Sequence, residues 1–188
     1  MDFSWLFFQF KCYTRVIYKI PDYVYVLLGS LLIIGFVIFL VKNGFRKGVR
    51  YSAVLMLVEY VMIIICATVI YRKTDLERRI DLQPLWSYQA CYNGHTTLLM
   101  EIAMNVVLFI PIGFLLGVSY RNVNWSKVVF VSSCLSVLIE VLQFAMKRGL
   151  AEVDDVLHNL LGCAIGYGLY AFLRYVYEKI SKRRVAVL

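Results

Sequence analysis

The strongest constraint in this sequence is a series of five apolar stretches, each long enough to cross a lipid bilayer. An α-helix rises about 1.5 Å per residue, so about 20 apolar residues cross a hydrocarbon core about 30 Å thick. Within lipid, backbone N–H and C=O groups find no water, so each stretch must be helical. The predicted membrane spans are 23–41, 51–71, 98–120, 126–146 and 156–177.

Composition argues against a water-soluble fold of this size. Hydrophobic residues make up 61% of the 188 residues, against roughly 45 to 50% in soluble domains. The net charge of +8 comes from basic residues that flank the apolar stretches, which favours anionic lipid headgroups as their partners and not nucleic acid. The sequence therefore predicts an all-α protein, a polytopic membrane helical bundle of about five transmembrane helices.

The segments outside the spans are mostly short and basic. Residues 1–22 repeat apolar side chains at helical spacing, with Lys11, Arg15 and Lys19 on another face, and this predicts an amphipathic helix at the membrane interface. We expect 23–50 to be the first transmembrane helix and a basic cytoplasmic loop, 51–177 the main transmembrane domain, and 178–188 a basic cytoplasmic tail. With the N-terminus outside, eleven of the 20 Lys and Arg residues fall on the cytoplasmic side, which favours this orientation.

Several polar side chains lie inside the predicted spans. Glu140 and Gln143 share one face of the fourth span, and Glu101 and Asn105 lie one turn apart in the third. An ionisable group at the centre of a span costs about 2.5 to 3.5 kcal/mol on insertion scales. Such groups usually face the interior of a bundle and mark functional sites. We therefore expect these faces to point inward.

Proline and glycine residues indicate where the spans bend and where they pack closely. Pro111 lacks an N–H group and is predicted to kink the third span near Gly113. In the fifth span, Gly162 and Gly166 lie on one stripe with Asn159 and allow another helix to approach the backbone. Pro111, Gly113, Gly162 and Gly166 are therefore predicted to be structural.

The loop between the fourth and fifth spans, 147–155, is too short to leave the membrane surface. Its Arg148 offers a fork of hydrogen-bond donors. Asp154 and Asp155 fall near the start of the fifth span, where unpaired N–H groups favour a carboxylate. Helix capping and pairing with Arg148 explain one of these two residues without a functional role. Asn105 and Asn159 can likewise serve only as hydrogen-bonding contacts between helices.

The sequence predicts no metal site and no cofactor. Its five cysteines include no C-x-x-C pair, and His95 and His158 match no common spacing of metal ligands. It also contains no G-x-S-x-G element and no Gly-rich phosphate loop. No conventional nucleophile is therefore indicated.

The order of the polar residues resembles the signature of the VanZ-like family. The resemblance covers about residues 51–177 and rests on Asn105 with Pro111 and Gly113, on Glu140-x-x-Gln143, and on Arg148, Asp154, Asp155, Asn159, Gly162 and Gly166. The segment 81–86 is similar to the family's N-L-x-P-F segment, with Asp81 and Leu85 in place of the usual Asn and Phe. The resemblance implies a bacterial multi-pass cell-membrane protein associated with resistance to teicoplanin and related lipoglycopeptides. It implies no known reaction.

Our leading hypothesis is a binding site near the outer face for the polar head of a membrane lipid or a lipid-linked cell-envelope molecule. Arg148 would bind a phosphate or carboxylate, and the carboxylates and amides would bind hydroxyl or amine groups. The predicted ligand-binding residues are Asn105, Gln143, Arg148 and Asn159, grouped with Glu140, Asp154 and Asp155.

Three other hypotheses fit the same residues. An intramembrane hydrolase or transferase acting on envelope lipids would use Glu140, Asp154 and Asp155 as catalytic residues. A small transporter or flippase would use the carboxylates as a proton relay, although no inverted repeat is visible. A structural subunit would use the polar residues only to fix helix packing. An oligomer is compatible with each hypothesis.

Overall fold

The computed structural model describes residues 20–120 and 122–185. This part of the chain is mostly helical and contains five helices that are long and apolar enough to cross a membrane. The prediction of an all-α membrane helical bundle is confirmed. The candidate spans are Asp22–Phe45, Lys47–Ile70, Leu98–Ser119, Trp125–Met146 and Val153–Ser181. The amphipathic helix predicted at 1–22 lies outside the described residues, except for its last three positions.

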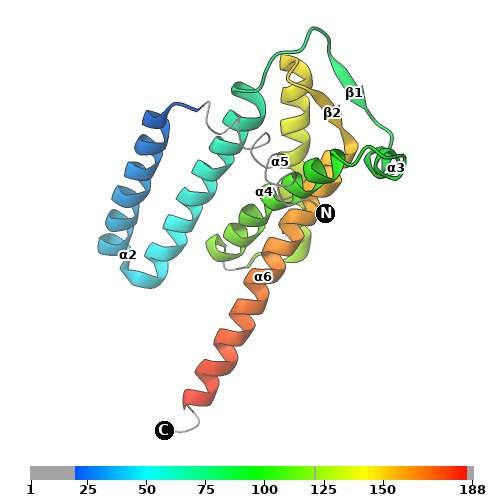
Figure 1. The fold of residues 1–188 in the computed structure, drawn as a ribbon. Helices are drawn as coiled ribbons and strands as arrows, with labels where there is room; N and C mark the ends of the chain where they lie inside the picture. The colour runs from blue at the N-terminus through cyan, green and yellow to red at the C-terminus, as the bar shows by residue number, and fades with distance from the viewer. Residues whose placement is uncertain (1–19, 121, 186–188) are drawn as a thin grey trace.

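The first two spans form a helical hairpin. Helix α2 (Asp22–Ile65) covers both and is interrupted at Gly44, where φ is 72° and ψ is 170°. Glycine adopts such a positive φ without steric cost, and the chain reverses there (Figure 1). The basic loop predicted between the spans is therefore largely helical. The rings of Phe39 and Tyr51 pack 5.5 Å apart across the hairpin. A π-helical turn, η2 (Cys66–Ile70), ends the second span.

The centre of the bundle consists of α4 (Leu98–Ser119), α5 (Trp125–Met146) and α6 (Val153–Val185), with α6 packed on both α4 and α5 (Figure 1). Helix α4 continues through Pro111 as one helix, and α6 continues beyond the predicted end of its span. The buried apolar core between the helices includes Ile64, Val69, Phe109, Ile112, Leu116, Val128, Ile139, Cys163 and Tyr167.

Three glycines set the distance between α4 and α6. At each of them an added Cβ would overlap a backbone carbonyl group of the other helix. The pairs are Gly113 with Cys163, Gly162 with Val106, and Gly166 with Ile110. The two backbones are thus in direct contact, and only hydrogen fits at these three positions.

We expect Gly166→Ala to destabilise the bundle by about 1 to 3 kcal/mol, because the new methyl group must push two backbones apart. Gly168→Ala is the matched control, since a Cβ at Gly168 would lie 3.6 Å from the Trp125 ring, an ordinary contact. Thermal unfolding of the two purified proteins measures the difference. Equal melting temperatures would contradict the packing role of Gly166.

The segment between η2 and α4 crosses one end of the bundle. It contains β1 (Arg79–Asp81) and α3 (Trp86–Tyr92). Strand β1 pairs in parallel with β2 (Leu150–Glu152), the connection from α5 to α6. Figure 1 shows both strands and α3 at the same end of the molecule. Strand β2 lies in the predicted loop 147–155, where three residues are too few to show a strand periodicity.

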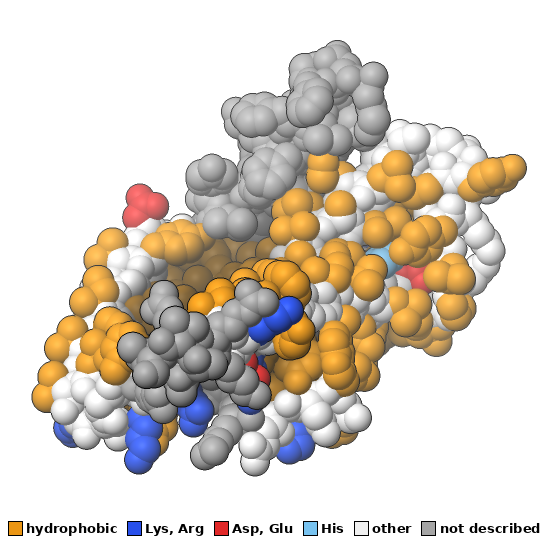
Figure 2. All heavy atoms as spheres, turned by 90° about the horizontal axis from the view of Figure 1, so that it is seen from below, with side chains coloured by type: hydrophobic (Ala, Val, Ile, Leu, Met, Phe, Trp, Pro, Cys, Tyr) orange, Lys and Arg blue, Asp and Glu red, His pale blue; other side chains and the backbone are white. Residues whose placement is uncertain are grey.

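The outer surface of the bundle is largely apolar. Figure 2 shows hydrophobic side chains over most of the described surface seen from below, with Lys and Arg side chains in a few separate places. Among the described residues, the apolar part of the first span buries none of its side chains against the rest of the protein. A surface of this kind is suited to contact with hydrocarbon, with the cations near the headgroups.

Candidate functional site

A cavity of about 390 Å³ lies between α2, α4, α5 and α6, within the size range of small-molecule sites. Part of its wall is apolar and includes Ile63, Ile64, Ala67, Leu108, Phe109 and Ile139. The rest is polar and includes Arg72, Glu101, Asn105, Glu140, Gln143, Asp155 and Asn159. A membrane-embedded cavity with these two kinds of wall can accept an amphiphilic molecule.

Most of the polar side chains come from the ends of the three central helices. Each helix contributes one pair within about two turns of its end, spaced three or four residues apart so that both members share a face. The pairs are Glu101 and Asn105 at the start of α4, Glu140 and Gln143 at the end of α5, and Asp155 and Asn159 at the start of α6. Five of these six residues are sequence-predicted site residues, and the structure brings them to one cavity.

Hydrogen bonds join the central helices around this cavity. Asn105 Nδ2 donates to Asp155 Oδ1 at 2.5 Å and links α4 to α6. Asn159 Nδ2 donates to Ser136 Oγ at 2.8 Å and links α6 to α5. The two asparagines therefore make hydrogen-bonding contacts between helices, which is one of the two roles that the sequence allows for them. They also line the cavity.

Glu140 is one of the three carboxylates that the sequence predicts as catalytic candidates. Its side chain is 8% exposed, and its Oε2 accepts a hydrogen bond from the backbone N–H of Glu152 at 3.0 Å. This bond ties the end of α5 to β2. It also fixes the direction in which the Glu140 carboxylate faces the cavity.

Within the part of the chain that the structure describes, the cation that lines the cavity is Arg72, and Arg148 is not among the lining residues. The Arg148 guanidinium instead donates to the backbone carbonyl of Arg72. The Arg72 guanidinium lies against Gly149, where an added Cβ would come within 2.6 Å of it. Sequence reasoning missed Arg72 because a basic residue directly after an apolar span is common. The sequence signal that could have identified Arg72 is its predicted position on the same membrane face as the loop 147–155.

Asp154, a predicted catalytic candidate, also lies outside the cavity lining. Its carboxylate is fully buried and accepts hydrogen bonds from Leu85 N at 2.5 Å, from Ser87 N at 3.0 Å and from Ser87 Oγ at 2.5 Å. One turn later, His158 Nε2 lies 3.0 Å from the Tyr88 hydroxyl. Neighbouring residues of a helix point about 100° apart. Asp154 therefore anchors the α3 segment while the next residue faces the cavity.

We expect Asp154→Ala to loosen α3, because three hydrogen bonds are lost and each buried N–H left unpaired is costly. Hydrogen exchange at 85–92 should become at least about tenfold faster. The control is Asp81→Ala, since the Asp81 carboxylate accepts a bond from nearby Gln83 within an exposed turn. Unchanged exchange at 85–92 in Asp154→Ala would show that Asp154 does not hold this segment.

Acidic groups are concentrated at this end of the bundle. The pKa of the Glu152 carboxyl is raised to about 7, first by burial and then by the nearby carboxylates of Asp155 and Glu101, while a 2.9 Å hydrogen bond from Trp86 Nε1 partly lowers it. The shift has the direction expected for a carboxyl group among like charges. In the described part of the chain, no group of three His, Cys, Asp or Glu side chains is arranged to hold a metal ion.

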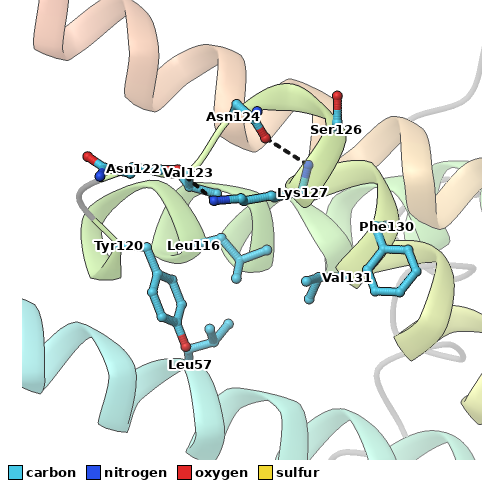
Figure 3. Close-up of a pocket in the computed structure, with 10 residues that line it drawn as sticks. All are labelled: Leu57, Leu116, Tyr120, Asn122, Val123, Asn124, Ser126, Lys127, Phe130 and Val131. Carbon is cyan, nitrogen blue, oxygen red and sulfur yellow. Dashed lines mark hydrogen bonds between the residues drawn. The ribbon is translucent and has the colours of Figure 1, made fainter.

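A larger cavity of about 820 Å³ lies at the other end of α4 and α5 (Figure 3). Its wall is mostly apolar, and Figure 3 shows hydrogen bonds that hold Lys127 to the nearby backbone and to Asn124. The Lys127 amine donates to the Asn122 carbonyl at 3.2 Å. None of the described residues that line it is acidic. The polar cavity is therefore the candidate functional site.

The fold and the polar cavity together define a multi-pass helical membrane protein with a cluster of polar groups near one end of its bundle. The sequence model of the VanZ/LLP1 family matches residues 50–174, and the chain belongs to this family. The matched range contains every residue that lines the polar cavity. The family resemblance predicted from the sequence is thereby confirmed.

One curated relative is the Protein VanZ of Enterococcus faecium. It is 37% identical over 71 residues, a match that covers 37% of this chain and 44% of the relative. The chain therefore matches less than half the length of that protein. No solved structure is significantly similar to the chain.

Proposed function

We propose that this protein binds the polar head group of a lipid or lipid-linked cell-envelope molecule in the polar cavity, and that this binding contributes to tolerance of teicoplanin-type lipoglycopeptides. The observation that carries the proposal is the convergence of Arg72, three carboxylates and three side-chain amides on one cavity of about 390 Å³ that also has an apolar wall. A packing role alone would not require an open cavity at the centre of these groups.

The position of the cavity supports an amphiphilic ligand. Its polar residues lie within about two turns of the helix ends, the level of lipid head groups if the spans are inserted as predicted. Its apolar residues on α2 and η2 can contact an acyl or isoprenoid chain. With the N-terminus outside, as the charge distribution favours, this end of the bundle belongs to the outer leaflet, where lipoglycopeptides meet the cell.

The polar groups divide the task of recognition. Arg72 takes the role that the sequence assigned to Arg148, because its guanidinium can bind a phosphate or carboxylate through two parallel hydrogen bonds. Arg148 supports Arg72 through its backbone carbonyl. Glu140 and Asp155, with the amides of Gln143 and Asn159, can bind hydroxyl or amine groups of the same molecule.

We expect Arg72→Gln and Glu140→Gln to reduce teicoplanin tolerance to the level of cells without the protein, because each change removes a charged contact in the cavity. The matched controls are Arg174→Gln and Glu178→Gln, which alter an exposed pair on α6. Drug susceptibility should be compared at equal membrane abundance of each variant. Full tolerance in both cavity variants would contradict the proposal.

An intramembrane hydrolase or transferase is the second candidate function. It is favoured by Glu140 and Asp155 lining the same cavity from two different helices, since paired carboxylates can act as general acid and general base. On this alternative, mass spectrometry of envelope lipids would show a covalent species that appears with the wild-type protein and disappears with Glu140→Gln. Identical lipid sets in the two strains would argue for binding without catalysis.

A further inference from the structure

The hydrogen-bond donors of the polar cavity are largely used within the protein. The Tyr60 hydroxyl donates to the Leu108 carbonyl at 2.9 Å, and the Thr68 hydroxyl donates to the Ile64 carbonyl at 2.8 Å. The side-chain NH2 group of each of the two asparagines donates one hydrogen bond to another helix, as described above. The donors that remain for a ligand among the described lining residues are mainly the charged Arg72 guanidinium and the neutral side-chain amide of Gln143.

The acceptors of the cavity, in contrast, are in surplus. Within the described residues, Gln143 Oε1 and Asn159 Oδ1 are buried and have no hydrogen-bond partner. Their side chains are 3% and 4% exposed. An unpaired buried acceptor is costly, and a carboxylate adds only further acceptors. A ligand that suits this cavity must therefore bring donors to it.

The charge of the cavity restricts the ligand further. Among the described residues, its lining carries the carboxylates of Glu101, Glu140 and Asp155 against the one guanidinium of Arg72. The cavity lies between protein helices, where the effective dielectric constant is lower than in bulk water, so unlike charges attract more strongly there than in solution. A neutral polyol would satisfy the acceptors but would leave the excess of negative charge unbalanced.

We infer that the head group bound in this cavity carries a primary ammonium group together with a phosphate or carboxylate. The ammonium group supplies three N–H donors, enough for three of four acceptor groups in the cavity, which are Glu140, Asp155 and the unpaired amide oxygens of Gln143 and Asn159. The anionic group binds Arg72. This inference rests on the proposed function, that a lipid head group occupies the cavity, and it specifies the chemical class of that head group.

The test compares three short-chain phospholipids that share the phosphate and the acyl chains. Phosphatidylethanolamine carries a primary ammonium, phosphatidylcholine carries a cation without N–H donors, and phosphatidylglycerol carries hydroxyl groups without a cation. Each is titrated into the purified full chain in a non-ionic detergent, and binding is followed by tryptophan fluorescence. We expect phosphatidylethanolamine to bind most tightly and the other two to bind about tenfold more weakly.

Variants separate the two parts of the head group. Asp155→Asn and Glu140→Gln should remove most of the preference for phosphatidylethanolamine, whereas Arg72→Gln should weaken all three phospholipids together. Glu178→Gln on the exposed surface of α6 should leave the order of the wild-type affinities unchanged. Melting temperatures of all variants are measured first. Asp155→Asn and Glu140→Gln are both included so that the test can be completed even if one of them does not fold.

The outcomes distinguish this inference from the proposed function. If phosphatidylglycerol or phosphatidylcholine binds the wild-type protein as tightly as phosphatidylethanolamine, and Arg72→Gln weakens that binding, a head group is bound but the primary ammonium is wrong. If none of the three binds, or if Arg72→Gln and both acidic variants bind all three like the wild-type protein, the proposed use of the cavity is wrong as well.

Discussion

The direct contact between the backbones of α4 and α6 determines most of the architecture around the cavity. Glycines at three positions let carbonyl groups of one helix lie where the other helix would otherwise carry a Cβ. This contact fixes the rotation of each helix about its axis. Asn105, next to the carbonyl partner of Gly162, is thereby directed at Asp155, and the acidic and amide stripe of α6 turns toward α5. The cavity lies between this locked pair of helices, the end of α5 and the end of the second span, which is joined to α4 by the Tyr60–Leu108 hydrogen bond.

The connections at the same end of the bundle complete the arrangement. Strand β2 ties the end of α5 to the start of α6, and its parallel pairing with β1 brings in the segment between the second and third spans. The two adjacent aspartates at the start of α6 have different roles. The Asp154 carboxylate accepts hydrogen bonds from the backbone of the α3 segment, and Asp155 faces the cavity. Arg148 and Arg72 show the same division, since one arginine supports the backbone of the other.

Much of the candidate site follows from helix periodicity alone. The spacing of Glu140 and Gln143, and of Asp155 and Asn159, places each pair on one face, and the cost of exposing such groups to lipid directs those faces inward. Periodicity does not place Arg148 and Asp154, because the local sequence does not show which partner uses their hydrogen bonds. Around Gly44, the segment predicted as a loop is helical with one residue of positive φ.

The sequence by itself determined that the chain is a bundle of membrane helices, which faces are polar, and which family it belongs to. Apolar length, helical period and motif order are local properties, so no knowledge of contacts is needed to read them. Only the tertiary structure decided which cation reaches the cavity, because Arg72 and Arg148 are 76 residues apart and meet through the pairing of β1 with β2 and the turn at Gly149. The unpaired acceptors Gln143 Oε1 and Asn159 Oδ1 likewise appear only once the helices are packed and the partners of the neighbouring donors are known.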